Sequence, residues 1–340
     1  MKSYKFLKSL TAAAAVVAAL GVSVADAADK RSYILTTAST GGTYYPVGVA
    51  LATLTKIKLE PKQKIALSAI SSAGSGENVK LLRENEAQFA ILQGLYGAWA
   101  WDGSGKLKES GPQKHLRAVS MLWQNVEHFG VKTDLAKTGT VDDLMNLKGM
   151  KFSIGKKNSG TEGSGRQILG GLGIDTDKTY DVAYLSYGPS ADAIQNGTIA
   201  GFNIPAGPPV GAITRAYAAL GKDLTILDFT DAQMKKANDG LTLWTRFVIP
   251  AGTYPGQDKE IKTIAQPNFL AVRDDVDEDA VYQITKTIYE NLPFLNGIHK
   301  ATKAMALNKA IAGLPVPLHP GSARFYREQG IEIPAHLISK

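Results

Sequence analysis

The sequence contains no cysteine among its 340 residues. This absence excludes disulfide bonds, zinc sites built on thiolates and cysteine nucleophiles. It also excludes a lipid anchor on an N-terminal cysteine of the mature chain. Charged residues are sparse as well, at 20% of the chain. No run of Lys or Arg is long enough to indicate nucleic-acid binding, so no nucleic-acid partner is expected.

Familiar catalytic motifs are missing too. A phosphate-binding P-loop needs Ser or Thr directly after Gly-Lys, and none of the Gly-Lys pairs in this chain has either. The dinucleotide pattern G-x-G-x-x-G, the nucleophile elbow G-x-S-x-G and the zinc motif His-Glu-x-x-His do not occur. We therefore expect no enzyme activity, no catalytic residue, no metal site and no cofactor.

The first 27 residues have the pattern of a secretory signal peptide. Three lysines precede an apolar stretch at 10–24 that is too short to span a membrane comfortably, and residues 25–27 form a small-residue cleavage site. We expect cleavage after residue 27 and export to a bacterial periplasm, with an uncleaved anchor helix as the alternative. Loss of the three lysines and Asp26 lowers the formal charge from +7 to +5. A mild positive field of this kind favours an anionic small ligand.

Short apolar runs alternate with helical patterns along residues 28–340. Each half holds three strand–turn–helix units. The expected strands are 33–38, 65–70, 89–92, 116–122 and 128–132, followed by 151–154, 182–185 and 199–204. This alternation predicts an α/β fold with largely parallel sheets, in which ligands bind beyond the carboxyl ends of the strands.

The length of the chain favours two domains. We expect a discontinuous first lobe of residues 28–129 and 251–340, and a second lobe of residues 130–250. Two sheets that face each other predict a ligand cleft between the lobes, with hinge motion around the ligand. Nothing in the sequence demands an oligomer, so a monomer is expected.

The stretch "ASTGGTYYPVG" (38–48) is typical of the turns that follow the expected strands. Gly41 and Gly42 allow close approach of the backbone, Thr43 offers a hydroxyl, and Tyr44 can wall a ligand. The unpaired N–H groups of a helix start favour a carboxylate, sulfonate or phosphate. An ordinary turn with Thr43 as helix cap accounts for this stretch taken alone. The chain holds six turns of this kind, three in each half, and their repetition favours ligand binding.

Other polar residues in these turns admit both interpretations. Ser72, Ser75 and Asn78 suit a ligand or a helix cap equally well. Ser159 and Thr161 favour a ligand, because "NSGT" holds more donors than a cap needs. Gln93 ends a strand, where polar residues are often functional, although solvent exposure explains it equally well.

Charged residues flank the same turns. Glu77 and Glu162 fall in the first turns of expected helices, where they favour the helix dipole or would pair with an ammonium group of the ligand. Lys156, Lys157 and Arg166 are expected in solvent, with one of them available as a counter-ion.

Seven stretches, in this order, resemble the TAXI family, the solute-binding subunits of TRAP transporters. They are "TTASTGGTYYPVG", "GSGENVKLL", "FAILQG", "LKGMKFSIGKKNSGTE", "IPAGTYPGQD", "VYQITKTIYEN" and "PLHPGSARFYREQG". The resemblance extends from about residue 32 to residue 331. Two stretches, "SAGSGEN" and "IAGFNIPAGPP", depart from the family pattern and leave the solute open.

The resemblance implies a two-lobed periplasmic binding protein, similar to type II, that closes around its solute and docks on a TRAP membrane permease driven by an ion gradient. It implies glutamate, glutamine or a dicarboxylate similar to 2-oxoglutarate as the solute, and closure of the site by the turn at 205–208. The alternatives are a subunit of an ABC-type importer, a sensor, and an enzyme on the same scaffold, like the pyrimidine synthases of thiamine biosynthesis. The residues expected to bind the ligand are Gly41, Gly42, Thr43, Tyr44, Ser72, Gly74, Ser75, Asn78, Gln93, Ser159, Gly160, Thr161 and Gly207.

Overall fold

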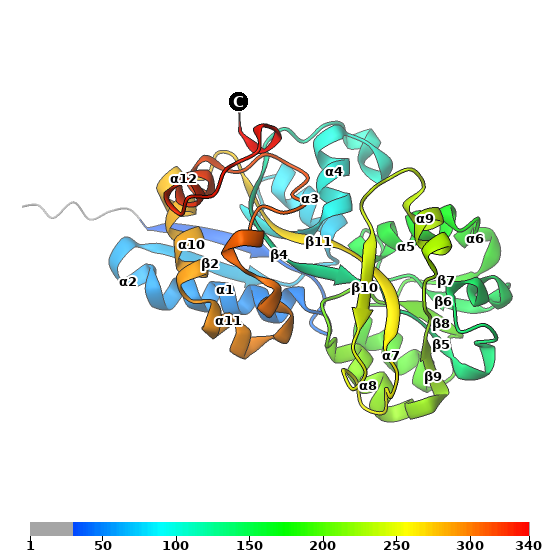
Figure 1. The fold of residues 1–340 in the computed structure, drawn as a ribbon. Coiled ribbons are helices and arrows are strands. Elements are labelled where there is room, and N and C mark those ends of the chain that lie inside the picture. Colours follow the sequence, from blue (N-terminus) through cyan, green and yellow to red (C-terminus); the bar gives the residue numbers. More distant parts are fainter. Residues whose placement is uncertain (1–29, 340) are drawn as a thin grey trace, which may run out of the picture.

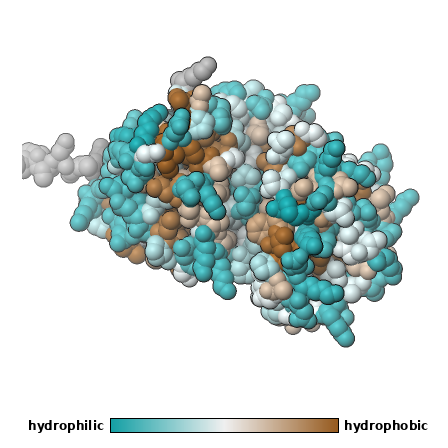
Figure 2. Space-filling view, in the orientation of Figure 1, coloured by the Kyte–Doolittle hydropathy of each residue, from teal (hydrophilic) through white to brown (hydrophobic). Residues whose placement is uncertain are grey.

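The computed structural model describes residues 30–339, so the expected signal peptide lies outside the described part. The described chain forms two lobes, each built on its own β-sheet, and the strands β4, β10 and β11 run across the middle between them (Figure 1). No helix within residues 30–339 is both long and apolar enough to cross a membrane. Hydrophilic side chains cover most of the face shown in Figure 2, with a hydrophobic patch on each lobe.

The first sheet has six strands in the order β10-β11-β3-β1-β2, with β4 paired to β11. They are β1 (Arg31–Thr36), β2 (Ile65–Ile70), β3 (Phe89–Gln93), β4 (Leu116–Val126), β10 (Thr245–Ile249) and β11 (Ile261–Arg273). Strand β1 pairs in parallel with β2 and β3, whereas β11 is antiparallel to β3, β4 and β10.

The second sheet has five strands in the order β7-β6-β8-β5-β9. They are β5 (Phe129–Lys132), β6 (Lys151–Ser153), β7 (Asp181–Ala183), β8 (Gly201–Asn203) and β9 (Leu224–Ile226). Strand β6 pairs in parallel with β7 and β8, and β5 is antiparallel to β8 and β9.

Helices cover the sheets of both lobes (Figure 1). They are α1 (Tyr44–Lys58), α2 (Glu60–Gln63), α3 (Ser75–Arg83), α4 (Gly94–Asp102), α5 (Gly160–Gly171), α6 (Thr176–Thr179), α7 (Tyr187–Gln195), α8 (Gly211–Leu220), α9 (Asp231–Asn238), α10 (Glu278–Glu290), α11 (Leu292–Ile298) and α12 (Pro320–Glu328). The C-terminal helix α12 returns to the first lobe, where the Tyr326 hydroxyl donates to the carbonyl of Val119.

Strand β3 shows why its residues form a central strand. Phe89 and Ile91 belong to one apolar cluster, and Ala90 and Leu92 belong to another. Successive side chains of a strand point to opposite faces, so a continuous apolar run is buried on both sides. Only the last residue, Gln93, is polar, and it stands at the carboxyl end of the strand.

One expectation about the sheets needs correction. The sheets are mixed rather than largely parallel, because β11 is antiparallel to β3, β4 and β10, and β5 is antiparallel to β8 and β9. Helix α5 begins at Gly160, because Ser159 caps it by accepting a hydrogen bond from the Glu162 N–H, and Glu162 therefore lies in the first turn as expected.

The strand β10 belongs to the sheet of the first lobe, although residues 130–250 are expected in the second. The division into lobes at 129/130 and 250/251 otherwise stays a prediction.

Candidate functional site

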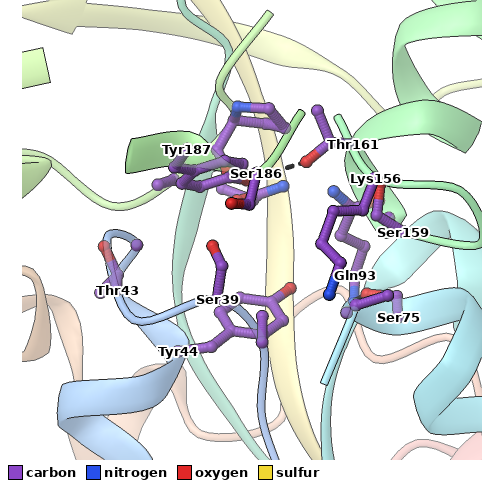
Figure 3. Close-up of a pocket in the computed structure, with 18 residues that line it drawn as sticks. Ser39, Thr43, Tyr44, Ser75, Gln93, Lys156, Ser159, Thr161, Ser186 and Tyr187 are labelled. Atoms are coloured by element: carbon purple, nitrogen blue, oxygen red, sulfur yellow. Dashed lines mark hydrogen bonds between the residues drawn. The ribbon is translucent and has the colours of Figure 1, made fainter. Parts of the chain in front are cut away.

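A pocket lies between the two lobes, with 18 residues lining it (Figure 3). Its empty space measures about 450 Å³, including the part open to solvent. In Figure 3, Ser39, Thr43 and Tyr44 lie on one side, Gln93, Lys156 and Ser159 on the other, and Tyr187 above. The first group follows β1, Gln93 is the last residue of β3, and Lys156 and Ser159 follow β6. The pocket therefore forms where strands of both sheets end.

Five helices begin at the wall of this pocket. The residues that precede their first turns all line it, namely Thr43 for α1, Gly74 for α3, Gln93 for α4, Ser159 for α5 and Ser186 for α7. Each helix start presents unpaired N–H groups and a partial positive charge. Their convergence makes the pocket electropositive without a cluster of basic side chains.

Nine of the thirteen residues expected to bind the ligand line this pocket. They are Gly42, Thr43, Tyr44, Gly74, Ser75, Gln93, Ser159, Gly160 and Thr161. The other four, Gly41, Ser72, Asn78 and Gly207, do not line it. Whether any of the thirteen binds a solute stays a prediction.

Asn78 and Ser72 connect the ends of two strands instead of facing the pocket. The Asn78 Nδ2 group donates to the carbonyls of Thr37 at 2.6 Å and Ile91 at 2.9 Å. Its Oδ1 accepts from Thr36 Oγ1 and from Ser72 Oγ. Because the amide is fully engaged and buried, we assign it a structural role.

Gly41 and Gly207 form contacts between the lobes. The carbonyl of Gly41 accepts from the Ala212 N–H at 3.2 Å, and the carbonyl of Gly207 accepts from Thr43 Oγ1 at 2.8 Å. A Cβ atom on Gly42 would stand 3.0 Å from the ring of Tyr187. The paired glycines therefore let the turn after β1 approach the start of α7.

Several hydroxyl groups in the wall already have partners. The Tyr187 hydroxyl donates to the Pro205 carbonyl at 2.6 Å, so Thr161 Oγ1 must be the donor in its 2.9 Å contact with Tyr187. The Tyr44 hydroxyl donates to Asn268 Oδ1. The Ser159 hydroxyl accepts from the Glu162 N–H and keeps its own proton for another acceptor.

Within residues 30–339, Lys156 is the only basic residue that lines the pocket. The two other basic residues that the sequence singled out beside this turn are engaged elsewhere. The ammonium of Lys157 stands 4.9 Å from the ring centre of Tyr184, and Arg166 forms an ion pair with Asp177 at 2.8 Å. Lys156 is thus the counter-ion that the geometry offers to an anionic ligand.

Sequence reasoning missed several residues of the wall. Asn125 belongs to β4, which extends to Val126, whereas the strand expected from the sequence ends at residue 122, so Asn125 was not singled out. Ser186 and Tyr187 fall in a turn that the sequence marked without singling out either side chain. Ser39 gave no signal, because short polar residues are common in turns. Pro205 and Ala206 belong to the turn at 205–208, which the resemblance implied for closure of the site, and both line the pocket.

Two buried titratable residues, Glu127 and His128, connect the sheets behind the pocket. Burial raises the pKa of Glu127 to about 7, although Asn203, Trp244 and Ser164 oppose this rise. Burial also lowers the pKa of His128 to about 4. The neutral imidazole donates from Nδ1 to the Val126 and Ile204 carbonyls and accepts at Nε2 from Tyr254.

Two mixed sheets covered by helices, with a pocket between the lobes, define the α/β fold of two-lobed periplasmic binding proteins. The chain belongs to the NMT1-like family, whose model matches residues 35–330. Among solved structures, the periplasmic binding protein BugD is similar in fold, with a TM-score of 0.52 and 10% identity over 88% of this chain and 94% of BugD.

Two other solved structures are more distant in fold. The alkanesulfonate-binding protein SsuA from Xanthomonas axonopodis pv. citri, bound to MOPS, has a TM-score of 0.47 and 12% identity over 89% of this chain and 92% of SsuA. A binding protein of an ABC phosphonate transporter from Pseudomonas aeruginosa has a TM-score of 0.48 and 12% identity over 79% and 78% of the two chains.

Proposed function

We propose that this protein captures a small organic anion between its lobes and delivers it to a membrane transporter. The observation that carries the proposal is the convergence of five helix starts and Lys156 on a pocket whose wall holds no Asp or Glu among the described residues. Positive potential from helix N-termini favours a bound anion.

Such a site can reach micromolar affinity without an arginine side chain that binds the anion. Micromolar affinity corresponds to about −8 kcal/mol. A hydrogen bond to a charged group contributes ~1.5–3 kcal/mol. Four to six such bonds would therefore reach this affinity before the entropy of association is counted. The wall offers Ser39, Ser75, Ser159 and Lys156 as donors, in addition to backbone N–H groups.

The delivery partner we propose is a TRAP permease, and the proposed location is the periplasm. The seven stretches that resemble the TAXI family support the first, and the pattern of residues 1–27 supports the second. The solutes that this resemblance implies are glutamate, glutamine and dicarboxylates similar to 2-oxoglutarate. The rival partner is an ATP-driven importer. The genes beside this one distinguish the two partners. A gene for a large permease without an ATPase gene would indicate a TRAP transporter rather than an ATP-driven importer.

The test is a thermal-shift screen and calorimetry on residues 28–340 with small organic anions. A solute at a hundred times its Kd adds about 2.7 kcal/mol to the free energy of unfolding. Lys156→Gln should then weaken binding roughly tenfold, as expected for a lost charged hydrogen bond. Lys157→Gln, in the same turn, should bind as the wild type does. No shift with any anion, and no solute retained on purification by native mass spectrometry, would contradict the proposal.

A further inference from the structure

The wall of the pocket offers no fixed negative charge to a ligand. Lys156 is the one side chain charged at neutral pH among the described residues that line it. Burial raises the pKa of Tyr44 and Tyr187 from the usual value, so both phenols stay protonated. An ammonium group would therefore meet the positive potential of Lys156 and of the helix starts.

The two acids that the sequence places beside the pocket are engaged elsewhere. Glu77 accepts from the N–H of Ala73. Glu162 pairs through Oε1 with Lys106 at 2.7 Å and with Arg166 at 3.3 Å, and its Oε2 accepts from the Asn158 N–H at 2.8 Å. Neither carboxylate lines the pocket. Neither is thus available to an ammonium group of a solute.

A third acid, Glu127, lies behind the wall rather than in it. Its side chain is fully buried, and Trp244 Nε1 donates to its Oε1 at 3.4 Å. Burial raises its pKa to about 7, so its ionised form is disfavoured compared with that of a solvated carboxylate. Glu127 does not line the pocket, so it offers no direct contact to an ammonium group of a solute.

Two amide side chains in the wall lack hydrogen-bond partners. Gln93 is 3% exposed and Asn125 is 1% exposed, and both line the pocket. Gln93 Oε1 and both polar atoms of Asn125 have no partner within residues 30–339. Buried amides are normally satisfied, so these atoms indicate a ligand group that both donates and accepts. A hydroxyl group, or an oxo group with a bound water, has this capacity.

We propose that the pocket selects small organic anions that carry a hydroxyl or oxo group and no ammonium group. Lys156 and the helix starts take the anionic head, and Gln93 and Asn125 take the neutral polar group. This inference rests on the proposed function, and it separates hydroxy and oxo acids from the amino acids of the same length.

Matched ligand pairs test it. Calorimetry would compare lactate with alanine, malate with aspartate, and 2-hydroxyglutarate or 2-oxoglutarate with glutamate. In the pair that fits the pocket, the hydroxy or oxo acid should bind at least tenfold more tightly than the amino acid. Equal or tighter binding of the amino acid would overturn this inference and leave the proposed function standing. Binding of no anion at all would overturn both.

A charge variant provides a second test. Gln93→Glu should weaken binding of the hydroxy or oxo acid and reduce its preference over the amino acid by roughly tenfold or more. Gln195→Glu makes the same change on the exposed end of α7 and should alter neither. If Gln93→Glu does not fold, Ser39→Asp adds a carboxylate to the wall from a half-buried turn. An unchanged preference in a folded pocket variant would contradict the inference.

Discussion

The hydroxyl of Thr43 donates a 2.8 Å hydrogen bond to the carbonyl of Gly207, a residue 164 positions further along the chain. The first residue precedes α1 in one lobe, and the second lies in the turn after β8 in the other. Thr43 therefore uses its hydroxyl proton in a hydrogen bond between the lobes, although its sequence context suggested a contact with the ligand. Similar contacts join Glu77 to Asn158 and Tyr96 to Ser159.

Replacement of Thr43 by Val should weaken solute binding. The variant keeps the shape of the side chain and leaves the Gly207 carbonyl without its donor in the closed form, at a cost of about 1–3 kcal/mol. Calorimetry should show a roughly tenfold higher Kd. Thr198→Val removes a hydroxyl that donates to Ala193 within one lobe, so it should lower Tm in the absence of solute and leave Kd unchanged. A normal Kd for Thr43→Val would disprove a role of this bond in closure.

Gly160 should tolerate no side chain. A Cβ atom there would stand 2.8 Å from Gln93 Cδ and 2.9 Å from Ser75 Oγ, across the seam between the lobes. Gly160→Ala should therefore hold the lobes apart and raise the Kd by roughly a hundredfold, since a steric clash of this kind costs ~1–3 kcal/mol.

A matched control lies in the same helix. Gly170 has nothing within 4 Å of an added Cβ atom, so Gly170→Ala should bind normally and gain roughly 0.5–1 kcal/mol in stability from its better helix propensity. Equal Kd values for the two variants would show that binding of the solute does not require the close contact of Gly160 with Gln93 and Ser75.

The buried neighbours Glu127 and His128 should give opposite slopes of stability against pH. Glu127 has a folded pKa of about 7 against an ordinary value of 4.5, so its contribution falls as pH rises from about 4.5 to 7. His128 has a folded pKa of about 4 against 6.5, so its contribution falls as pH drops from about 6.5 to 4. The two slopes largely cancel between pH 4.5 and 6.5.

Glu127→Gln should remove the contribution of Glu127 to the pH dependence of stability and leave that of His128. Urea unfolding at pH 5 should give the variant a stability near that of the wild type, whereas at pH 8 the variant should be more stable by on the order of 3 kcal/mol. Glu86→Gln makes the same change at an exposed position and serves as the control. A constant difference for Glu127→Gln would mean that this carboxyl titrates normally.

Trp123 should report closure by fluorescence. Its ring lies against Gly207, where an added Cβ would stand 2.6 Å from Cδ1, and it packs edge-on to Tyr44 at 6.0 Å. Opening of the lobes would expose this face of the indole. Solute should therefore change the emission of the wild type, and Trp123→Phe should abolish most of that change. Trp101→Phe, at a site in α4 beside Lys114, should preserve it.

The nine predicted residues in the pocket wall could be found from the sequence, because the pattern that marks them is local. A strand end followed by Gly, Ser or Thr and then a helix is a short-range pattern, and it marks where backbone donors are unpaired. Gly42, Gly74 and Ser159 all belong to such patterns. Asn125 and Lys156 gave no comparable signal, because their roles depend on which face of a strand or turn borders the other lobe.

The sequence by itself determined the alternation of strands and helices, the paired sets of polar turns and the absence of thiol chemistry. These features follow from the spacing and type of neighbouring residues. Only the tertiary structure decided that Thr43 and Gly41 serve contacts between lobes, that Asn78 is structural, and that Glu77 and Glu162 turn away from the pocket. Thr43, Gly41 and Asn78 form hydrogen bonds with residues far away along the chain, and such pairings have no signature in a single sequence.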